Sequence, residues 1–189
     1  MNWLVFALMM WVMMGCDLGL RSLLALGSSS ISPRFALVLL VFVCLHAPPG
    51  AMMLASVAIG LVMDIVSVTP MAETSAPLVV IGPYTLGCML AAYAILTVRS
   101  VMQRKSPFTM AALALVATVL VEVVRLTLLT VRSFYDGLAL EEAATSLGTS
   151  LGIAAYTAVL AFALTPVLGA LRRALRFHGS SGMGFVIHS

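Results

Sequence analysis

The chain has 189 residues, enough for one compact domain, and 62% of them are hydrophobic while only 9% are charged. A soluble domain carries roughly 25% charged residues, so this chain has too little polar surface to cover a water-soluble globule. The composition excludes an ordinary soluble domain and indicates an integral membrane protein with the lipid bilayer as its solvent. The net charge is +3, and the basic clusters stand beside apolar segments, so no stretch is typical of a nucleic-acid-binding surface.

Six apolar segments are expected to be membrane helices and predict an all-α, polytopic membrane helix bundle. The first would be roughly 36 Å long as a helix, enough to cross a bilayer with some tilt. It lacks a basic n-region and continues past any plausible cleavage point, so we expect a first membrane helix and not a cleaved signal peptide. The segments are residues 3–26, 35–45, 51–68, 78–98, 108–131 and 146–171, with 1–175 as a single transmembrane bundle and 176–189 as a short cytoplasmic tail.

The second segment is short and is expected to turn sharply into the third. Its apolar run would be only about 17 Å long as a helix. Ala47-Pro48-Pro49-Gly50 follows it. Because proline cannot continue a helix and glycine permits a turn, the two segments are expected to form a tight hairpin. The short arm must then pack against protein or lie where the bilayer is locally thin.

The placement of basic residues predicts the orientation. Six of the ten Lys and Arg residues stand in two places, the loop from Arg99 to Lys105 and the stretch from Arg172 to Arg176. Loops rich in Lys and Arg stay in the cytoplasm, and two spans separate these places, so both are expected there. Counting back over four more spans places the N-terminus in the cytoplasm as well. The acidic loops near Glu73 and Glu141 are then expected outside.

Charged side chains inside the segments are candidates for functional sites, since each costs about 2.5 to 3.5 kcal/mol to insert. Asp17 and Arg21 are four residues apart in the first segment, and Glu122 and Arg125 are three residues apart in the fifth. The two residues of each pair therefore share a helix face and can neutralise each other. Such pairs either hold the bundle together or form a polar contact to a partner helix or an ion path, and both interpretations stay open.

Asp64, near the end of the third segment, has no basic residue within a helical turn. It either reaches water at the outer face or makes an inter-helix hydrogen bond, for example to Arg21 or Arg34. Four residues before it stands Gly60, and small residues at four-residue spacing let helices approach closely. Such pairs favour a closely packed bundle without identifying a partner. They are Gly15 and Gly19, Ser56 and Gly60, and Gly148 and Gly152.

The residues suggest neither catalysis nor metal binding. Cys16, Cys44 and Cys88 each stand inside an apolar run without metal-ligand spacing, and the three histidines form no cluster. The sequence has no nucleophile beside a base, no glycine-rich phosphate loop and no paired carboxylates in an apolar stretch. We therefore expect a protein that is not an enzyme and that needs no metal or cofactor.

The third segment carries a motif with a known likeness. Gly60-Leu61-Val62-Met63-Asp64, followed by Thr69-Pro70, resembles the Gly-Leu-x-x-Asp signature of MreD, the family of bacterial rod shape-determining membrane proteins. Pro48-Pro49-Gly50 stands where that family turns before its third helix, and the likeness covers roughly residues 1–175. Two features depart from the family. Pro70-Met71-Ala72 replaces its usual Pro-Leu-Gly run, and Val121 stands where a tyrosine often precedes the glutamate.

The resemblance implies a non-enzymatic scaffold of cell-wall elongation in the bacterial inner membrane, involved in cell shape. The chain would bind a single-span (bitopic) MreC-like protein. It would help to couple MreB filaments, directly or indirectly, to the polymerase and transpeptidase of peptidoglycan synthesis. The partner-binding or intramembrane polar residues would be Asp64, Gly60, Asp17, Arg21, Glu122 and Arg125.

Two alternative functions remain open. The first is the substrate-binding membrane subunit of a vitamin uptake transporter, a class of similar size with six helices that needs a polar pocket near the outer face. The second is a proton- or ion-coupled transporter that uses the two charged pairs. The absence of an evident internal repeat disfavours a coupled transporter.

Overall fold

The computed structural model describes residues 2–21, 23–24, 31–70, 77–79, 82–99, 106–136 and 143–171. Within these ranges the chain is helical apart from one short antiparallel hairpin, in agreement with the predicted all-α class. The helices are α1 (Trp3–Gly19), α2 (Phe35–His46), α3 (Pro49–Val66), α4 (Pro83–Val98), α5 (Pro107–Asp136) and α6 (Ala143–Leu171), and the strands are β1 (Val68–Pro70) and β2 (Pro77–Val79).

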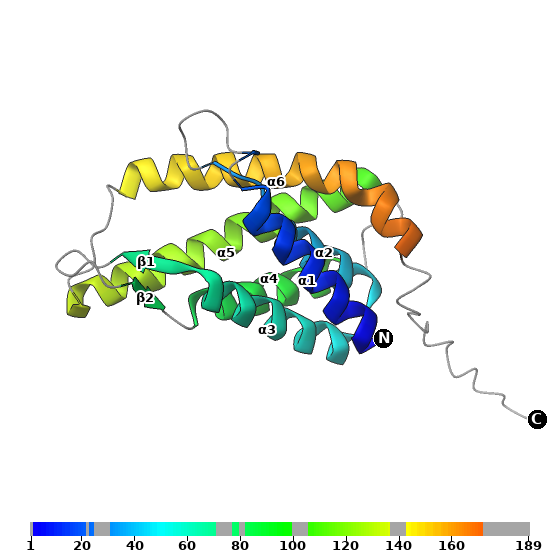
Figure 1. The fold of residues 1–189 in the computed structure, drawn as a ribbon, viewed down its shortest axis with the longest axis horizontal. Helices are drawn as coiled ribbons and strands as arrows, with labels where there is room; N and C mark the ends of the chain where they lie inside the picture. The colour runs from blue at the N-terminus through cyan, green and yellow to red at the C-terminus, as the bar shows by residue number, and fades with distance from the viewer. Residues whose placement is uncertain are drawn as a thin grey trace, which may run out of the picture.

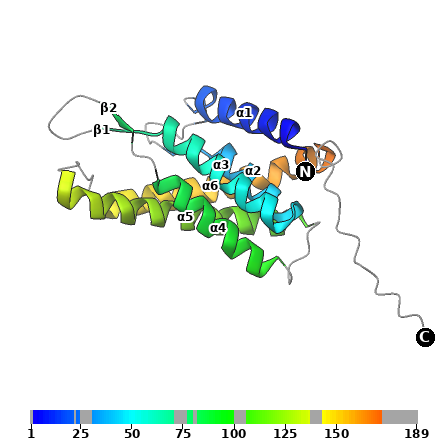
Figure 2. The same ribbon diagram turned by 90° about the horizontal axis from the view of Figure 1, so that it is seen from below.

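Four helices pack on one another in chain order, and two further helices lie against them. α3 contacts α4, α4 contacts α5, and α5 contacts α6. α2 contacts all four of these helices, and α1 packs on α2 (Figure 1). In the view from below, α1 lies at one side of the molecule and α4 and α5 lie at the other (Figure 2). α2 is therefore the central helix.

Burial explains why a helix as short as α2 is stable in this position. Every residue from Phe35 to Leu45 is buried. Its 12 residues are apolar all round except for the terminal His46, a pattern typical of a helix enclosed by protein. At 1.5 Å per residue it is roughly 18 Å long. The prediction of a short second helix in a tight hairpin, packed against protein, is confirmed, because α1 and α3 to α6 all contact it.

Within the described part of the chain, three helices are long and apolar enough to cross a membrane, and they indicate a membrane protein. They are Pro49–Val66, Pro107–Val131 and Gly148–Ala170. The other three, α1, α2 and α4, are apolar but shorter. The outer surface also carries large apolar side chains: Trp11 is 80% exposed and Leu4 is 77% exposed. Such a surface suits contact with lipid or with another membrane helix better than contact with water.

The structure corrects the bounds of several predicted segments. The first helix ends at Gly19 and not at residue 26, and the fourth begins at Pro83 and not at residue 78. The fifth ends at Asp136 and not at residue 131, and the sixth begins at Ala143 and not at residue 146. Proline suits the first position of a helix, where its missing N–H is not needed, and α3, α4 and α5 all begin at a proline. Residues 77–79 pair instead with 68–70, where a polar loop was expected. The expected cytoplasmic tail, residues 176–189, lies outside the described residues.

Gly60 allows α3 and α4 to approach closely. A Cβ atom at this position would lie 2.5 Å from Cα of Thr85 and 3.0 Å from the carbonyl oxygen of Tyr84. The other predicted small-residue pairs are placed differently. Among the described residues, nothing lies within 4 Å of a Cβ built at Gly15, Gly19 or Gly148, and a Cβ built at Gly152 would lie 3.0 Å from the Cδ1 atom of Ile31. Of the glycines in the predicted small-residue pairs, Gly60 is therefore the one that lies against the backbone of another helix.

We expect Gly60→Ala to lower the free energy of unfolding by about 1 to 3 kcal/mol, because the added methyl group meets the α4 backbone. Gly15→Ala is the matched control. It makes the same change in open space, where the higher helix propensity of alanine favours folding by up to about 1 kcal/mol. Unfolding of the detergent-purified protein measures both variants, and equal stabilities would contradict the close contact.

Candidate functional site

Asp64 connects the end of α3 to the start of α4. Its Oδ1 accepts a hydrogen bond from the N–H of Tyr84 at 2.8 Å, and its Oδ2 accepts from the N–H groups of Gly82 and Thr85 at 2.9 and 3.0 Å. The Thr85 hydroxyl donates to Oδ2 at 2.6 Å. The first N–H groups of a helix lack partners within the helix, and α4 has no capping side chain of its own. Asp64 therefore caps α4 from a neighbouring helix.

Two glycines make this contact possible. Gly82, directly before α4, has a φ of 130°, in the left-handed region that favours glycine. Gly60 lies one turn before Asp64 and admits the backbone of Thr85. Asp64 is 0% exposed, so the interpretation in which it reaches water is wrong. The inter-helix hydrogen bond is confirmed, although its partners are backbone and hydroxyl groups around the start of α4 and not the side chains of Arg21 or Arg34.

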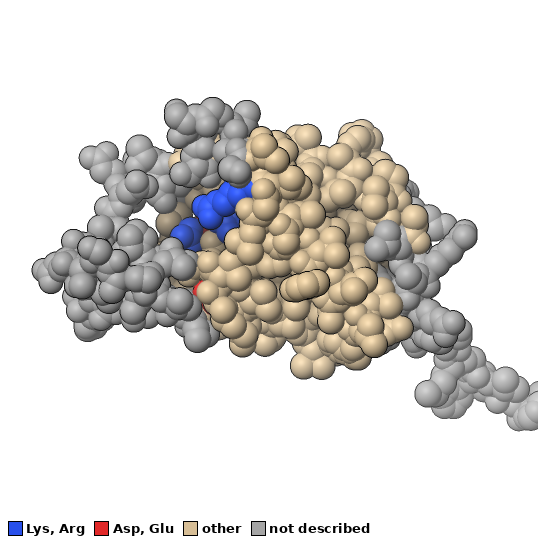
Figure 3. All heavy atoms as spheres, in the orientation of Figure 1, with Lys and Arg blue, Asp and Glu red and all other residues tan. Residues whose placement is uncertain are grey.

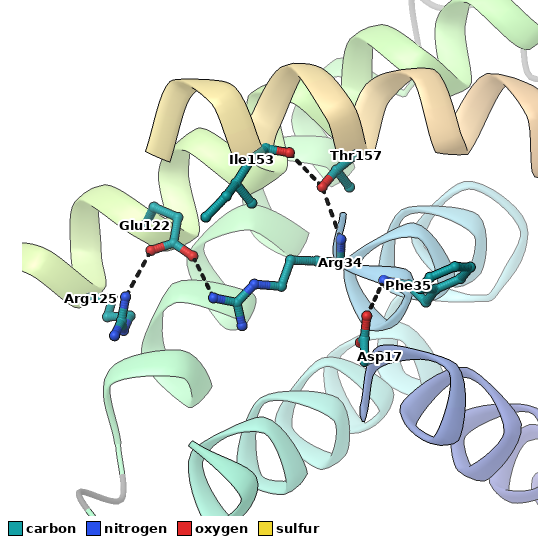
Figure 4. Close-up of polar contacts among 7 residues, drawn as sticks. All are labelled: Asp17, Arg34, Phe35, Glu122, Arg125, Ile153 and Thr157. Carbon is teal, nitrogen blue, oxygen red and sulfur yellow. Dashed lines mark hydrogen bonds and ion pairs between the residues drawn. The ribbon is translucent and has the colours of Figure 1, made fainter. Parts of the chain in front are cut away.

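Asp17 caps α2 in the same manner. Its two carboxylate oxygens accept from the N–H of Phe35 at 2.6 Å and of Ala36 at 2.9 Å, the first of which is drawn in Figure 4. α2 also has no capping side chain of its own. From their spacing Asp17 and Arg21 could neutralise each other, but no ion pair joins these two residues, both of which the structure describes. The Asp17 carboxylate instead lies at the N-terminal, positive end of the α2 dipole, where a negative charge is stabilising.

A cation holds the opposite end of α2. Nη1 of Arg99 donates to the carbonyl oxygens of Cys44 at 3.1 Å and of Ala47 at 2.8 Å. The last carbonyl groups of a helix lack intrahelical partners and carry the negative end of its dipole, so a guanidinium satisfies both requirements. Arg99 was predicted only as an orientation signal, and its contact with α2 is a function that sequence reasoning missed.

Glu122 on α5 is the centre of an ion-pair cluster. Its Oε1 lies 3.4 Å from Nη2 of Arg34, and its Oε2 lies 3.2 Å from Nη1 of Arg125 (Figure 4). The Glu122 side chain is 2% exposed, whereas those of Arg34 and Arg125 are 22% and 30% exposed. The predicted pair of Glu122 and Arg125 is confirmed. Arg34 is a second partner, because the fold places the start of α2 against α5.

Arg34 is positioned by further contacts. Its backbone N–H donates to the hydroxyl of Thr157 on α6 at 3.1 Å. This hydroxyl in turn donates to the carbonyl of Ile153, also on α6, at 2.7 Å (Figure 4). The guanidinium carbon atoms of Arg34 and Arg125 lie 5.4 and 5.3 Å from the centroid of the Tyr84 ring, within the range of cation–π contacts. Tyr84 thereby links the ion-pair cluster to the part of α4 that Asp64 caps.

A cavity of about 300 Å³ lies beside this cluster, at the end of the bundle where α1 and α3 end and α2 and α4 begin. Its lining includes Arg21, Arg34, Arg125, Asp17 and Tyr84. Figure 3 shows basic side chains gathered in a hollow of a face that is otherwise mostly uncharged over its described surface. We call this space, defined by these five residues, the arginine cavity.

The structure separates the predicted site residues into two places. Asp17, Arg21 and Arg125 line the arginine cavity, and Glu122 contacts one of these residues. Asp64 and Gly60 lie in the contact between α3 and α4. Of the other cavity residues, sequence reasoning named Arg34 only as a possible partner of Asp64, and it did not single out Tyr84. The position of Arg34, directly before a short and fully apolar segment, was the available signal.

The described residues contain no group of three or more His, Cys, Asp or Glu side chains that could hold a metal ion. Comparisons with models of known protein families, with curated proteins and with solved structures find no match for this chain. The functional proposals below therefore rest on the geometry of the bundle and on the motif around Asp64.

We expect Asp64→Asn to lower the free energy of unfolding by about 3 kcal/mol, because hydrogen bonds to a charged group are lost inside the bundle. Asn2→Ala is the control, since Asn2 caps α1 at an exposed position with one hydrogen bond of 3.2 Å to the Leu4 N–H. That change should cost about 1 kcal/mol or less. Thermal and chemical unfolding in detergent measure both variants. A loss at Asp64 no larger than that at Asn2 would contradict the buried cap.

Glu122→Gln should be the most harmful single change in the ion-pair cluster, costing about 3 to 5 kcal/mol, because Arg34 and Arg125 both lose their carboxylate. Arg125→Gln leaves the contact between Glu122 and Arg34 and should be milder. In a double-mutant cycle, the two changes together should cost less than their sum by about 0.5 to 3 kcal/mol. Strictly additive losses of stability would mean that Arg125 has a different partner.

Proposed function

We propose that this chain is a non-enzymatic, multi-pass scaffold of the bacterial inner membrane that serves cell-wall elongation, as MreD does. The supporting observation is how the acidic residues of the helices are used. Asp17, Asp64 and Glu122 each bind groups from another helix, which makes them structural contacts within the bundle. The outer faces are apolar, and apolar helix faces are where a single-span partner packs in a membrane.

The motif that carries the resemblance forms one structural unit, which also supports this proposal. Gly60 brings the α4 backbone close to α3, and Asp64 caps that same backbone. The two ends of the Gly-Leu-x-x-Asp pattern therefore serve a single contact. A chain that keeps this pattern keeps the way in which its third and fourth helices join. The resemblance thus rests on residues that specify the fold.

The proposed topology has six crossings with both termini in the cytoplasm. In this orientation Arg99 and the end of α2 lie on the cytoplasmic side, where basic residues are expected. The arginine cavity and the β1–β2 hairpin then lie toward the outer face. The proposed partners are a bitopic MreC-like protein, the polymerase and transpeptidase of wall synthesis, and MreB filaments reached directly or indirectly.

A second function is favoured by one specific observation. The substrate-binding subunit of a vitamin uptake transporter needs a polar pocket near the outer face, and the arginine cavity is polar and lies at that end in the proposed orientation. Such a carrier binds a ligand by itself and associates with an ATPase-driven transporter subunit. A scaffold associates with proteins of wall synthesis, so the partners distinguish the two functions.

The topology predicts which positions a membrane-impermeant thiol reagent reaches in intact cells. Single cysteines replacing Glu73 or Glu141 should be labelled from outside, and cysteines replacing Gln103 or His178 should be labelled only after the cells are opened. A chain with Cys16→Ser is the background, since Cys44 and Cys88 are buried. External labelling at position 103 would disprove the proposed orientation.

Affinity purification from native membranes should recover a bitopic partner and wall-synthesis enzymes, and depletion should make a rod-shaped host round or wide. The reason is that a scaffold without chemistry of its own acts through the proteins it holds together. An unrelated multi-pass protein with the same tag is the control for non-specific recovery. Recovery of an ATPase pair, together with tight binding of a vitamin-sized molecule by the purified chain, would replace the scaffold by the carrier.

A further inference from the structure

Three of the ten basic residues of the chain line one cavity, although they are far apart in the sequence. Arg21 lies just after α1, Arg34 directly precedes α2, and Arg125 belongs to α5. Six of the other basic residues stand in the two clusters expected in the cytoplasm. The gathering of these three guanidinium groups is therefore a product of the fold. Figure 3 shows basic side chains together in a hollow of the described surface.

The residues that line this cavity carry more positive than negative charge. Glu122 contacts both Arg34 and Arg125, so one carboxylate serves two guanidinium groups. Asp17 is engaged by the N–H groups at the start of α2. The lining itself holds three guanidinium groups and one carboxylate, that of Asp17. Glu122 and Asp64 lie behind it, the first against Arg34 and Arg125 and the second against the N–H groups at the start of α4. Excess charge in surroundings of low polarity is unfavourable unless an anion neutralises it.

Two of the three arginines, Arg34 and Arg125, are held in place before any ligand binds. Glu122 and the Tyr84 ring fix the guanidinium groups of Arg34 and Arg125. Each guanidinium has five N–H donors, and the contact with Glu122 uses one nitrogen atom of each. The planar fork of arginine binds phosphate through paired hydrogen bonds. A volume of about 300 Å³ is at the lower end of ligand sites and suits a small polar group.

The location of the cavity indicates where its ligand comes from. Leu18 near the end of α1, Val66 at the end of α3 and Tyr84 at the start of α4 all line it. Membrane-crossing helices end near the headgroups of the lipids, and basic pockets between such helices bind anionic headgroups. In the proposed topology the arginine cavity therefore lies near the depth of the lipid phosphates on the outer side of the membrane.

We propose that the arginine cavity binds a phosphate-bearing anion, with its phosphate group held by Arg21, Arg34 and Arg125. An anionic phospholipid and a soluble phosphate compound offer the same chemistry, and the position at the helix ends favours the lipid. The site requires only the membrane bundle. It does not depend on the wall-synthesis partners of the proposed scaffold.

Binding is tested with the purified full-length chain, without partners. The chain is reconstituted in phosphatidylcholine nanodiscs with or without phosphatidylglycerol, and lipids retained after release into detergent are counted by native mass spectrometry. In parallel, inorganic pyrophosphate is added in detergent and the unfolding temperature is followed. Arg21→Gln should weaken binding of the effective probe roughly tenfold, as expected for the loss of one charge-assisted hydrogen bond. Because Arg21 is exposed and is not paired with Glu122, this variant should fold normally.

Two further variants complete the test. Arg125→Gln should weaken binding at least as much as Arg21→Gln, and its unfolding temperature without ligand separates lost binding from lost folding. Arg104→Gln is the matched control, because it removes one arginine from the chain between α4 and α5. The end of α4 and the start of α5 lie away from the cavity.

Retention of phosphatidylglycerol that depends on Arg21 and Arg125 but not on Arg104 would establish a lipid ligand. A pyrophosphate-dependent rise in unfolding temperature with the same dependence, without lipid retention, would establish a soluble phosphate ligand. Equal retention by all variants, or an equal loss in Arg104→Gln, would overturn the proposal. Each of these results leaves the recovery of wall-synthesis partners unchanged, so the proposal of an anion site and the proposal of a scaffold can be refuted independently.

Discussion

The burial of α2 is the constraint on which the rest of the bundle depends. A helix enclosed on every side cannot send its terminal N–H and C=O groups to water, so other parts of the protein must satisfy them. Asp17 from α1 meets the first N–H groups, and Arg99 at the end of α4 meets the last carbonyls. Both charges oppose the dipole of α2. The apolar centre of the protein therefore determines where two of its charged residues must stand.

A carboxylate from one helix also caps the start of the next helix between α3 and α4. Asp64 caps α4 from outside, as Asp17 caps α2, and in both cases the first capped N–H lies 18 residues further along the chain. Neither capped helix has a capping side chain of its own. α1 and α3 thus each carry an aspartate near their end that caps the start of the next helix. These carboxylates have structural partners, which distinguishes them from the groups of an ion path.

The arginines near Glu122 are different, because three of them line one cavity whose lining contains a single carboxylate, that of Asp17. The Glu122 carboxylate accepts from two guanidinium groups, and Arg21 adds a third beside the same cavity. Two ideas about function thus arise from two parts of the molecule. The apolar outer faces support a scaffold that binds membrane partners, and the arginine cavity supports a site for an anion. The two activities can coexist, because the first uses the outside of the bundle and the second uses a space between its helices.

The sequence by itself determined the helical class, the approximate place of each helix, the short second helix and the pair of Glu122 with Arg125. These features follow from local rules, since apolar runs, prolines and residues three or four positions apart act through the geometry of a single helix. It did not determine the hairpin of β1 and β2, because three-residue strands carry too little pattern. Only the tertiary structure decided that Asp17 and Asp64 bind helix starts and that Arg34 meets Glu122. These contacts join residues 18 to 88 positions apart, so they depend on how the helices pack and not on which residues are neighbours in the chain.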